Sequence, residues 1–375
     1  MKKIIRATTV PISLYAFCDG LLSKLSTEYE VIALSSPGEL LEKVSEREGV
    51  RTIAIPMERR ISIWKDLKSL FSLIKVFRKE RPDMVHSMTP KAGLLCMLAG
   101  RLTRVPVRIH TFTGLVWPTT EGVQRKVLML TDRITCACAT HIIPEGEGVK
   151  NDLISGKITK NPLKVLGYGN VRGTDMDYYD RTPEVKESAA PLIDKDKFTF
   201  LFVGRIVKDK GVNELVNAFL RLNLLKPETR LFLVGPYEDD IDPVLPETRK
   251  AIDDNEAIIA VGRKSDVRPY YAASDCFVFP SYREGFPNTV LEAGAMGLPS
   301  IVTDINGSRE IVEDGFNGLI VPSKNEGALF DAMKKIVEDS DLRDKLSSAA
   351  RQRIEERFEK SFVQKCLIDF YHHVL

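Results

Sequence analysis

Short apolar runs alternate with helical patterns along the first third of the chain, and this alternation constrains the fold more than any other feature. The expected strands are 4–10, 30–35, 52–56, 84–87 and 107–111. The expected helices between them are 15–25, 39–48, 64–78 and 93–103. Strands that alternate with helices in this way predict βαβ units and a parallel sheet with helices on both faces.

A second region of alternating strands and helices begins at Phe198. The stretch before it, 168–197, does not continue the alternation. The expected strands of this region are 198–203, 230–234, 257–261, 276–280 and 300–303, and the chain closes with expected helices 326–338, 342–360 and 361–371. A chain of 375 residues is too long for one typical core. We therefore expect two doubly wound α/β domains, 1–168 and 181–360, joined by a linker at 169–180.

Composition excludes several other classes of protein. The net charge of +2 gives no general attraction to nucleic acid, and 43% hydrophobic with 28% charged residues is ordinary for a soluble globular protein. The six cysteines lie mostly in apolar company, without zinc-ligand spacing, which favours reduced thiols in a cytosolic protein. The first residues imitate a signal peptide, but Arg6 and Pro11 interrupt the apolar run and favour a first strand.

The segment 276–322 predicts a strand, a loop, a helix and a second strand. The helix should begin near Asn288, a good N-cap, and end near Gly297. The loop would lie at the carboxyl edge of the sheet, where open α/β sheets bind ligands, and the helix start suits a phosphate. Glu284 and Glu292 frame this helix start. Each could be an ordinary solvated acid, but Glu292 lies among small apolar residues, and a buried acid needs a partner such as a ligand hydroxyl.

The run from Glu284 to Glu292 resembles the E-x7-E donor motif of the family 4 retaining glycosyltransferases. The later blocks 307–310 and 314–322 also resemble that family. The resemblance is strongest over 198–322 and implies the GT-B fold, in which two Rossmann-like domains face a cleft. It also implies that the C-terminal helix, 361–375, packs back on the first domain.

The loop 204–211 matches the family pattern G-R-x(4)-K-G. The resemblance places Arg205 and Lys210 on the donor diphosphate, and two phosphates do call for about two positive charges. The alternative is a solvated charged turn. In the family the turn at Arg263 lies against the nucleotide base. The donor site implied by the resemblance is Gly204, Arg205, Lys210, Arg263, Glu284, Gly285, Phe286, Asn288, Thr289 and Glu292.

The stretches 83–93 and 107–114 resemble the acceptor domain of enzymes that build bacterial surface polysaccharides. In those enzymes a strand ends in H-T-x-H-G, and the first histidine, here His110, lines the cleft opposite the donor. The second histidine is replaced by Thr113. The alternative for His110 is a strand-end histidine bonded to backbone, and His86 is expected to be structural.

The first loop, 9–13, carries no G-x-G-x-x-G, which argues against a dinucleotide-binding dehydrogenase. The family often has a Gly-Gly pair there, close to the donor phosphates, whereas this chain has Pro11, Ile12 and Ser13.

Two stretches, 58–81 and 122–138, combine an excess of basic residues with apolar ones. The basic residues are Arg59, Arg60, Lys65, Lys68, Lys75, Arg78, Lys79, Arg81, Arg125, Lys126 and Arg133. Such a pattern is typical of an amphipathic helix on anionic lipid, but also of a helix packed on the sheet with a solvated basic face. The resemblance favours membrane contact, because many such enzymes act on lipid-linked acceptors.

The resemblance implies a retaining transferase of the hexosyl or N-acetylhexosaminyl type, working on a nucleotide-sugar, by family habit a UDP-sugar. The acceptor would be a hydroxyl of a polyprenyl-diphosphate-linked saccharide, and the enzyme would lie in the cytoplasm or peripherally on the inner face of the membrane. His110, Glu284, Arg205 and Lys210 would serve catalysis without a metal or other cofactor. Three alternatives stay open: a glycosidase using both acids, a nucleotide-sugar 2-epimerase of the same fold, and a non-catalytic sugar-nucleotide-binding protein.

Overall fold

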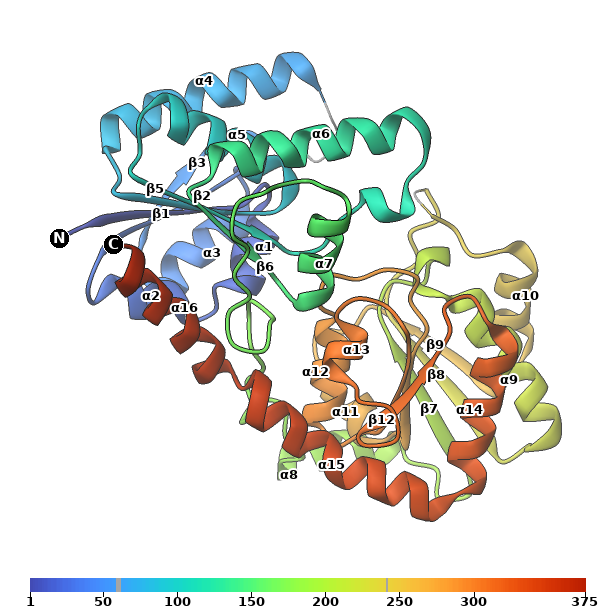
Figure 1. Ribbon diagram of the computed structural model, residues 1–375. Coiled ribbons are helices and arrows are strands. Elements are labelled where there is room, and N and C mark those ends of the chain that lie inside the picture. Colours follow the sequence, from blue (N-terminus) through green and yellow to red (C-terminus); the bar gives the residue numbers. More distant parts are fainter. Residues whose placement is uncertain (59–61, 241) are drawn as a thin grey trace. The chain divides into compact units, whose positions relative to one another are not determined.

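A computed structural model describes residues 1–58, 62–240 and 242–375 (Figure 1). The chain forms two compact units. Unit 1 holds residues 1–173 and 361–375, and unit 2 holds residues 174–360. The first crossing between the units thus falls inside the stretch 169–180 that the sequence suggests as a linker, and each unit is described below by itself.

Unit 1 is built on a six-stranded parallel sheet in the order β3-β2-β1-β4-β5-β6. Its strands are β1 (Lys3–Ala7), β2 (Glu30–Ser35), β3 (Arg51–Ala54), β4 (Met84–Met88), β5 (Val107–Phe112) and β6 (His141–Pro144). Its helices are α1 (Pro11–Phe17), α2 (Leu21–Ser26), α3 (Glu39–Glu48), α4 (Ile63–Glu80), α5 (Pro90–Leu102), α6 (Gly122–Cys138), α7 (Glu147–Ser155) and α16 (Lys360–Val374). Successive strand residues point to opposite faces, so Ile5 and Ile4 belong to different buried clusters.

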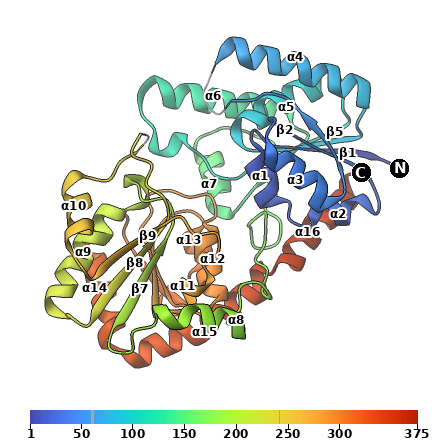
Figure 2. The same ribbon diagram turned by 180° about the vertical axis from the view of Figure 1, so that it is seen from behind.

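The helices of unit 1 form a layer on each face of this sheet. Helices α4, α5 and α6 contribute to the cluster that contains Ile5, and α1, α2, α3 and α16 contribute to the cluster that contains Ile4 (Figures 1 and 2). The C-terminal helix is therefore part of the core of unit 1, where Phe370 and Tyr371 are buried.

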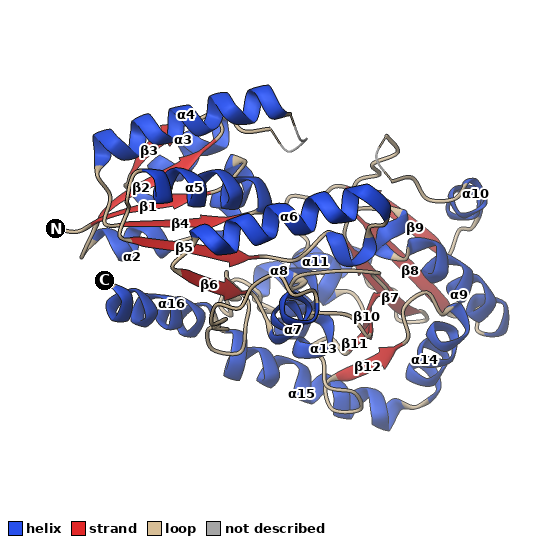
Figure 3. Cartoon of the chain, turned by 45° about the horizontal axis from the view of Figure 1, so that its top comes forward, coloured by secondary structure: helices blue, strands red, loops and turns tan. Residues whose placement is uncertain are grey.

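Unit 2 is built on a second six-stranded parallel sheet, in the order β12-β11-β10-β7-β8-β9 (Figure 3). Its strands are β7 (Phe198–Val203), β8 (Thr229–Val234), β9 (Ile258–Gly262), β10 (Cys276–Phe279), β11 (Ser300–Thr303) and β12 (Gly318–Val321). Its helices are α8 (Pro183–Ala189), α9 (Val212–Leu225), α10 (Pro246–Asp254), α11 (Arg268–Ala272), α12 (Asn288–Ala295), α13 (Ser308–Ile311), α14 (Glu326–Glu338) and α15 (Ser340–Phe358). Counted along each unit, both sheets have the Rossmann strand order 3-2-1-4-5-6, which confirms the predicted fold class.

Two local predictions were wrong, and one helix was missed. The helix expected over 15–25 is two helices, α1 and α2, separated by Gly20 in the left-handed region at φ 70°. Because Pro11 can occupy a first helical turn without losing a hydrogen bond, the expected first loop 9–13 passes directly into α1. The polar stretch before β7 contains α8, which Thr182 caps by accepting a hydrogen bond from the Val185 N–H at 3.4 Å.

Neither a membrane-spanning helix nor a metal-binding group was found in residues 1–58, 62–240 and 242–375. No helix there is both long and apolar enough to cross a bilayer. No cluster of three or more histidine, cysteine or acidic side chains there could hold a metal ion.

We expect one acid of unit 1 to make the stability of the protein depend on pH. Asp132 of α6 accepts a hydrogen bond from Trp117 Nε1 at 3.1 Å, and burial raises its pKa to about 7. The unfolded carboxyl releases its proton near pH 4, so stability should fall as pH rises from about 4 to about 7. We expect Asp132→Asn to raise stability at pH 8 by about 2 kcal/mol and to leave it unchanged at pH 4, as measured by thermal unfolding. Exposed Glu42→Gln is the control, and a pH-independent effect of Asp132→Asn would contradict the assignment.

Candidate functional site

The first and fourth strands of unit 2, β7 and β10, are neighbours in the sheet. The connection after β7 leads to β8 on one side of this pair, and the connection after β10 leads to β11 on the other side. The loops that follow β7 and β10, 204–211 and 280–287, open at the same carboxyl edge. A parallel sheet binds ligands at such a point, where the strand order reverses. The meeting point of these two loops is the candidate site, and it is called the switch point below.

Lys210 and Glu284 meet at this switch point, although they are 74 positions apart in the sequence. The Lys210 ammonium forms an ion pair with Glu284 Oε1, and it lies 5.2 Å from the centre of the Phe279 ring. Ser281 Oγ, which is fully buried, donates to the same carboxylate oxygen at 2.8 Å. Two residues of the predicted site are thus brought together, and Ser281 is a third partner that the sequence did not reveal.

Two glycines let other loops approach the loop 280–287 closely. Gly211 has φ 69°, and a Cβ atom there would lie 2.0 Å from the Pro280 carbonyl oxygen. Gly307 has φ 73°, and its Cβ would lie 2.5 Å from the Gly285 carbonyl oxygen. Only glycine fits both the backbone conformation and the space at these positions.

Further side chains brace the same two loops. Arg283 Nη2 donates to Asp209 Oδ2 at 2.9 Å, and Tyr282 Oη donates to Glu214 at 2.6 Å. Burial and the neighbouring Glu214 both raise the pKa of Tyr282, so its hydroxyl stays protonated and keeps donating. Sequence reasoning missed these residues. The available signal was the pair of opposite charges, Asp209 and Arg283, on the two loops of the predicted switch point.

Arg205 stands apart from the Lys210–Glu284 pair. Its guanidinium donates to Glu238 Oε2 at 2.6 Å, and its side chain is 47% exposed. The backbone of Gly204 packs closely against Gly235. A Cβ atom at Gly235 would lie 1.8 Å from the Gly204 carbonyl oxygen. Arg263 is exposed in the turn after β9, and within the described ranges no hydrogen bond joins it to this cluster.

Helix α12 begins directly after the loop 280–287. Its N-cap is Pro287, with no side-chain cap, so the prediction of Asn288 as N-cap was wrong and Asn288 is the first helical residue. Glu292 is only 7% exposed and accepts a hydrogen bond from Tyr271 Oη at 3.3 Å. Tyr271 Oη also lies 3.2 Å from the backbone oxygen of Thr289. The burial inferred for Glu292 from its apolar neighbours is observed. Phe286, by contrast, packs in the core against Phe358.

His110 lies in β5 of unit 1 and is 1% exposed. Its Nδ1 is 3.0 Å from Ser87 Oγ, and its ring meets Phe112 edge-on at 4.5 Å between centroids. The ring also packs against Gly93, where a Cβ would come within 2.3 Å of Cε1. Burial lowers the pKa of His110 to about 3, so the imidazole is neutral and can act only as a hydrogen-bonding group near neutral pH. Its role toward a substrate stays a prediction.

The two basic stretches form α4 and α6 on one side of unit 1, with α5 between them (Figure 3). Large apolar side chains point outward from both helices: Trp64 (84% exposed), Phe71 (63%), Val123 (77%) and Leu130 (54%). A helix that only buried its apolar face against the sheet would not expose these side chains. Arg59, Arg60 and Ile61 of the first stretch lie outside the described residues.

The sequence matches two protein families. Residues 184–353 match "Glycosyl transferases group 1", and residues 22–169 match "Glycosyl transferase 4-like domain". The chain is 33% identical, over 322 residues covering 86% of it and 84% of the relative, to the capsular polysaccharide biosynthesis glycosyltransferase CapM of Staphylococcus aureus. It is 30% identical, over 79% of it and 77% of the relative, to the UDP-Gal:alpha-D-GlcNAc-diphosphoundecaprenol alpha-1,3-galactosyltransferase of Escherichia coli.

Solved structures show the same fold. The crystal structure of Anabaena Alr3699/HepE in complex with UDP superposes with a TM-score of 0.81 at 16% identity, covering 99% of this chain and 100% of that one. The glycosyltransferase of Rickettsia africae superposes with a TM-score of 0.79 at 21% identity, covering 100% and 98%.

Proposed function

The chain belongs to the group 1 glycosyl transferases, which are family 4 enzymes of the GT-B fold class, and on that premise we propose a retaining transfer from a nucleotide-sugar. The acceptor is a hydroxyl of a lipid-linked saccharide in polysaccharide synthesis. The Escherichia coli relative, named for UDP-Gal and a diphosphoundecaprenol-linked acceptor, supports a UDP-sugar donor and a lipid-linked acceptor. The observation that carries the proposal is the meeting of Lys210 and Glu284 at the switch point of unit 2.

The hard step in such a transfer is departure of the nucleoside diphosphate, which takes the electron pair of the sugar–oxygen bond. Lys210 and Arg205 supply two positive charges for it, and the N-terminus of α12 supplies the positive end of a helix dipole. In this proposal Glu284 holds the transferred sugar and Glu292 holds the ribose hydroxyls. No metal takes part, so EDTA should leave turnover unchanged.

The donor site predicts selective stabilisation by one nucleoside diphosphate. UDP at about 100 times its dissociation constant should stabilise unit 2 by about 2.7 kcal/mol, a rise of several degrees in thermal unfolding. GDP and ADP should do less. Arg205→Ala should lose most of the shift, whereas Lys208→Ala, which removes an exposed charge from the same loop, should keep it. A protein that no nucleotide stabilises would refute the site.

Membrane contact through α4 and α6 forms the second part of the proposal and would place the enzyme peripherally on the cytoplasmic face. On α4, Trp64, Leu67 and Phe71 follow one outward stripe that continues to Lys75. We expect Trp64→Ser with Phe71→Ser to weaken binding to vesicles containing anionic lipid by at least about tenfold, measured by co-sedimentation. The matched control is Leu224→Ser with Leu225→Ser, which removes two equally exposed apolar side chains from α9. Equal losses in the two double variants would argue against a specific surface.

The rivals predict different substrate requirements. A 2-epimerase turns over the nucleotide-sugar without any acceptor, a glycosidase releases sugar without any nucleotide, and a binding protein turns over nothing. Release of nucleoside diphosphate that depends on both donor and lipid-linked acceptor would distinguish the transferase from all three.

A further inference from the structure

A buried arginine of unit 1 lacks an acidic partner. Arg6 of β1 is 1% exposed. Its guanidinium donates to Tyr371 Oη at 2.8 Å, to Met88 Sδ at 3.0 Å and to His86 Nδ1, and it lies 3.8 Å from Cys18 Sγ. Among the described residues no carboxylate pairs with it, and its Nε has no hydrogen-bond partner.

The groups around Arg6 are all neutral. Burial raises the pKa of Tyr371 to about 12 and also raises that of Cys18, while burial lowers the pKa of His86 well below its ordinary value. A guanidinium keeps its proton in proteins. Unit 1 therefore buries a full positive charge among neutral acceptors, two of which are sulfur atoms, and such a charge is costly unless an anion lies beside it.

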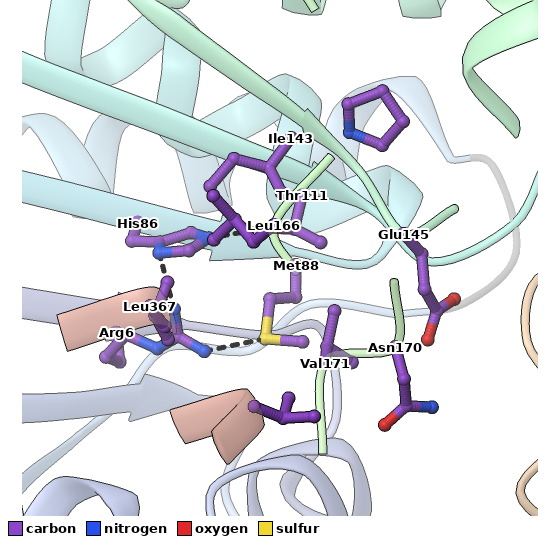
Figure 4. Close-up of a pocket in the computed structure, with 12 residues that line it drawn as sticks. Arg6, His86, Met88, Thr111, Ile143, Glu145, Leu166, Asn170, Val171 and Leu367 are labelled. Atoms are coloured by element: carbon purple, nitrogen blue, oxygen red, sulfur yellow. Dashed lines mark hydrogen bonds between the residues drawn. The ribbon is translucent and has the colours of Figure 1, made fainter. Parts of the chain in front are cut away.

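A small cavity of about 20 Å³ adjoins this charge. Figure 4 shows Arg6 and His86 at one end of the pocket, and Glu145 and Asn170 at the other, with the Glu145 carboxylate directed away from Arg6. The walls between these ends are mostly apolar and include Met88, Ile143, Leu166, Val171, Val363 and Leu367. The free volume fits one guest about the size of a water molecule.

We propose that this cavity binds a small monovalent anion, of the size of a halide ion, against the Arg6 guanidinium. The volume is too small for a phosphate or a nucleotide. Because Tyr371 and Leu367 belong to α16, the anion also strengthens the attachment of this helix to the sheet. The cavity lies within unit 1, so the inference does not rest on the proposed donor site.

Bromide is the probe, because its anomalous X-ray scattering identifies it directly. Crystals of the full chain grown or soaked in sodium bromide should show an anomalous peak beside Arg6. In solution, sodium chloride at about ten times its dissociation constant should raise the unfolding temperature by about 3 °C over sodium gluconate at equal ionic strength.

Three variants make the test specific. Arg6→Met should abolish the chloride-dependent rise, whereas Arg104→Met, which removes an exposed arginine of the same unit, should retain it. Val171→Leu adds bulk to the cavity wall and should reduce the rise while keeping Arg6, which covers the case that Arg6→Met does not fold. A water molecule in place of bromide would overturn the proposal. So would a bromide peak without any chloride-dependent stability, because that result marks binding at crystal concentration only.

Discussion

Replacing Lys210 by methionine should lower kcat by about 10²–10³-fold, because it removes a fixed positive charge from the site where the leaving diphosphate develops its charge. It also leaves Glu284 without its ion-pair partner, in a site where both side chains are mostly buried. The measurement is steady-state turnover with the nucleotide-sugar that the thermal assay selects, followed as release of nucleoside diphosphate.

The control for this variant is Lys208→Met, which makes the same change two residues earlier in the same loop. It should leave kcat within about threefold, since loss of an exposed surface charge away from the ion pair changes stability and rates little. Circular dichroism of both variants should match the parent. Normal kcat in Lys210→Met would mean that the switch point of unit 2 does not bind the leaving group.

Replacing Gly211 by alanine should be among the most destabilising single changes in unit 2. The new Cβ would have to occupy a left-handed backbone position and would lie 2.0 Å from the carbonyl oxygen of Pro280. Backbone strain of about 1 kcal/mol and overpacking of about 1–3 kcal/mol together predict a fall of roughly 5–15 °C in the unfolding temperature. Because the clash separates the two loops that carry Lys210 and Glu284, nucleotide binding should weaken as well.

Gly297→Ala separates the two contributions. Gly297 has a similar φ of 76°, but nothing lies within 4 Å of its Cβ position. This variant should lose only about 1 kcal/mol, or roughly 2–4 °C, and should bind nucleotide normally. Equal losses at the two positions would show that the loops can move apart without cost.

Most strands of the two sheets were predictable because they are buried on both faces, so that each reads as a short apolar run. The last strand of each sheet, β6 and β12, was not among the expected strands. Burial of Glu292 was predictable for a related reason: an acid inside an apolar helix has no solvent face to occupy. The short polar helices α8 and α10 were missed, because hydrophilic segments of this length have the composition of loops unless their capping residues are recognised.

The candidate site was only half predictable. The resemblance of two motifs to the family brought Lys210 and Glu284 into one prediction, but it could not reveal that Ser281, Tyr282 and Arg283 hold the loops in place. Those contacts depend on which strands become neighbours, and strand order is a tertiary property. The burial of His110 in unit 1 could not be predicted for the same reason. The sequence of a strand that ends in histidine does not show whether a glycine such as Gly93 packs against the ring.

The return of the last helix to unit 1 has a consequence for synthesis on the ribosome. Residues 361–375 complete a core whose other residues all lie between 1 and 173, and Tyr371 accepts a hydrogen bond from Arg6. The first unit to emerge is thus the last to be complete, and it must wait for about 190 further residues, roughly 10–40 s at bacterial or eukaryotic translation rates. During that interval its exposed apolar face is a natural substrate for chaperones, and a chain that ends early would damage the unit made first.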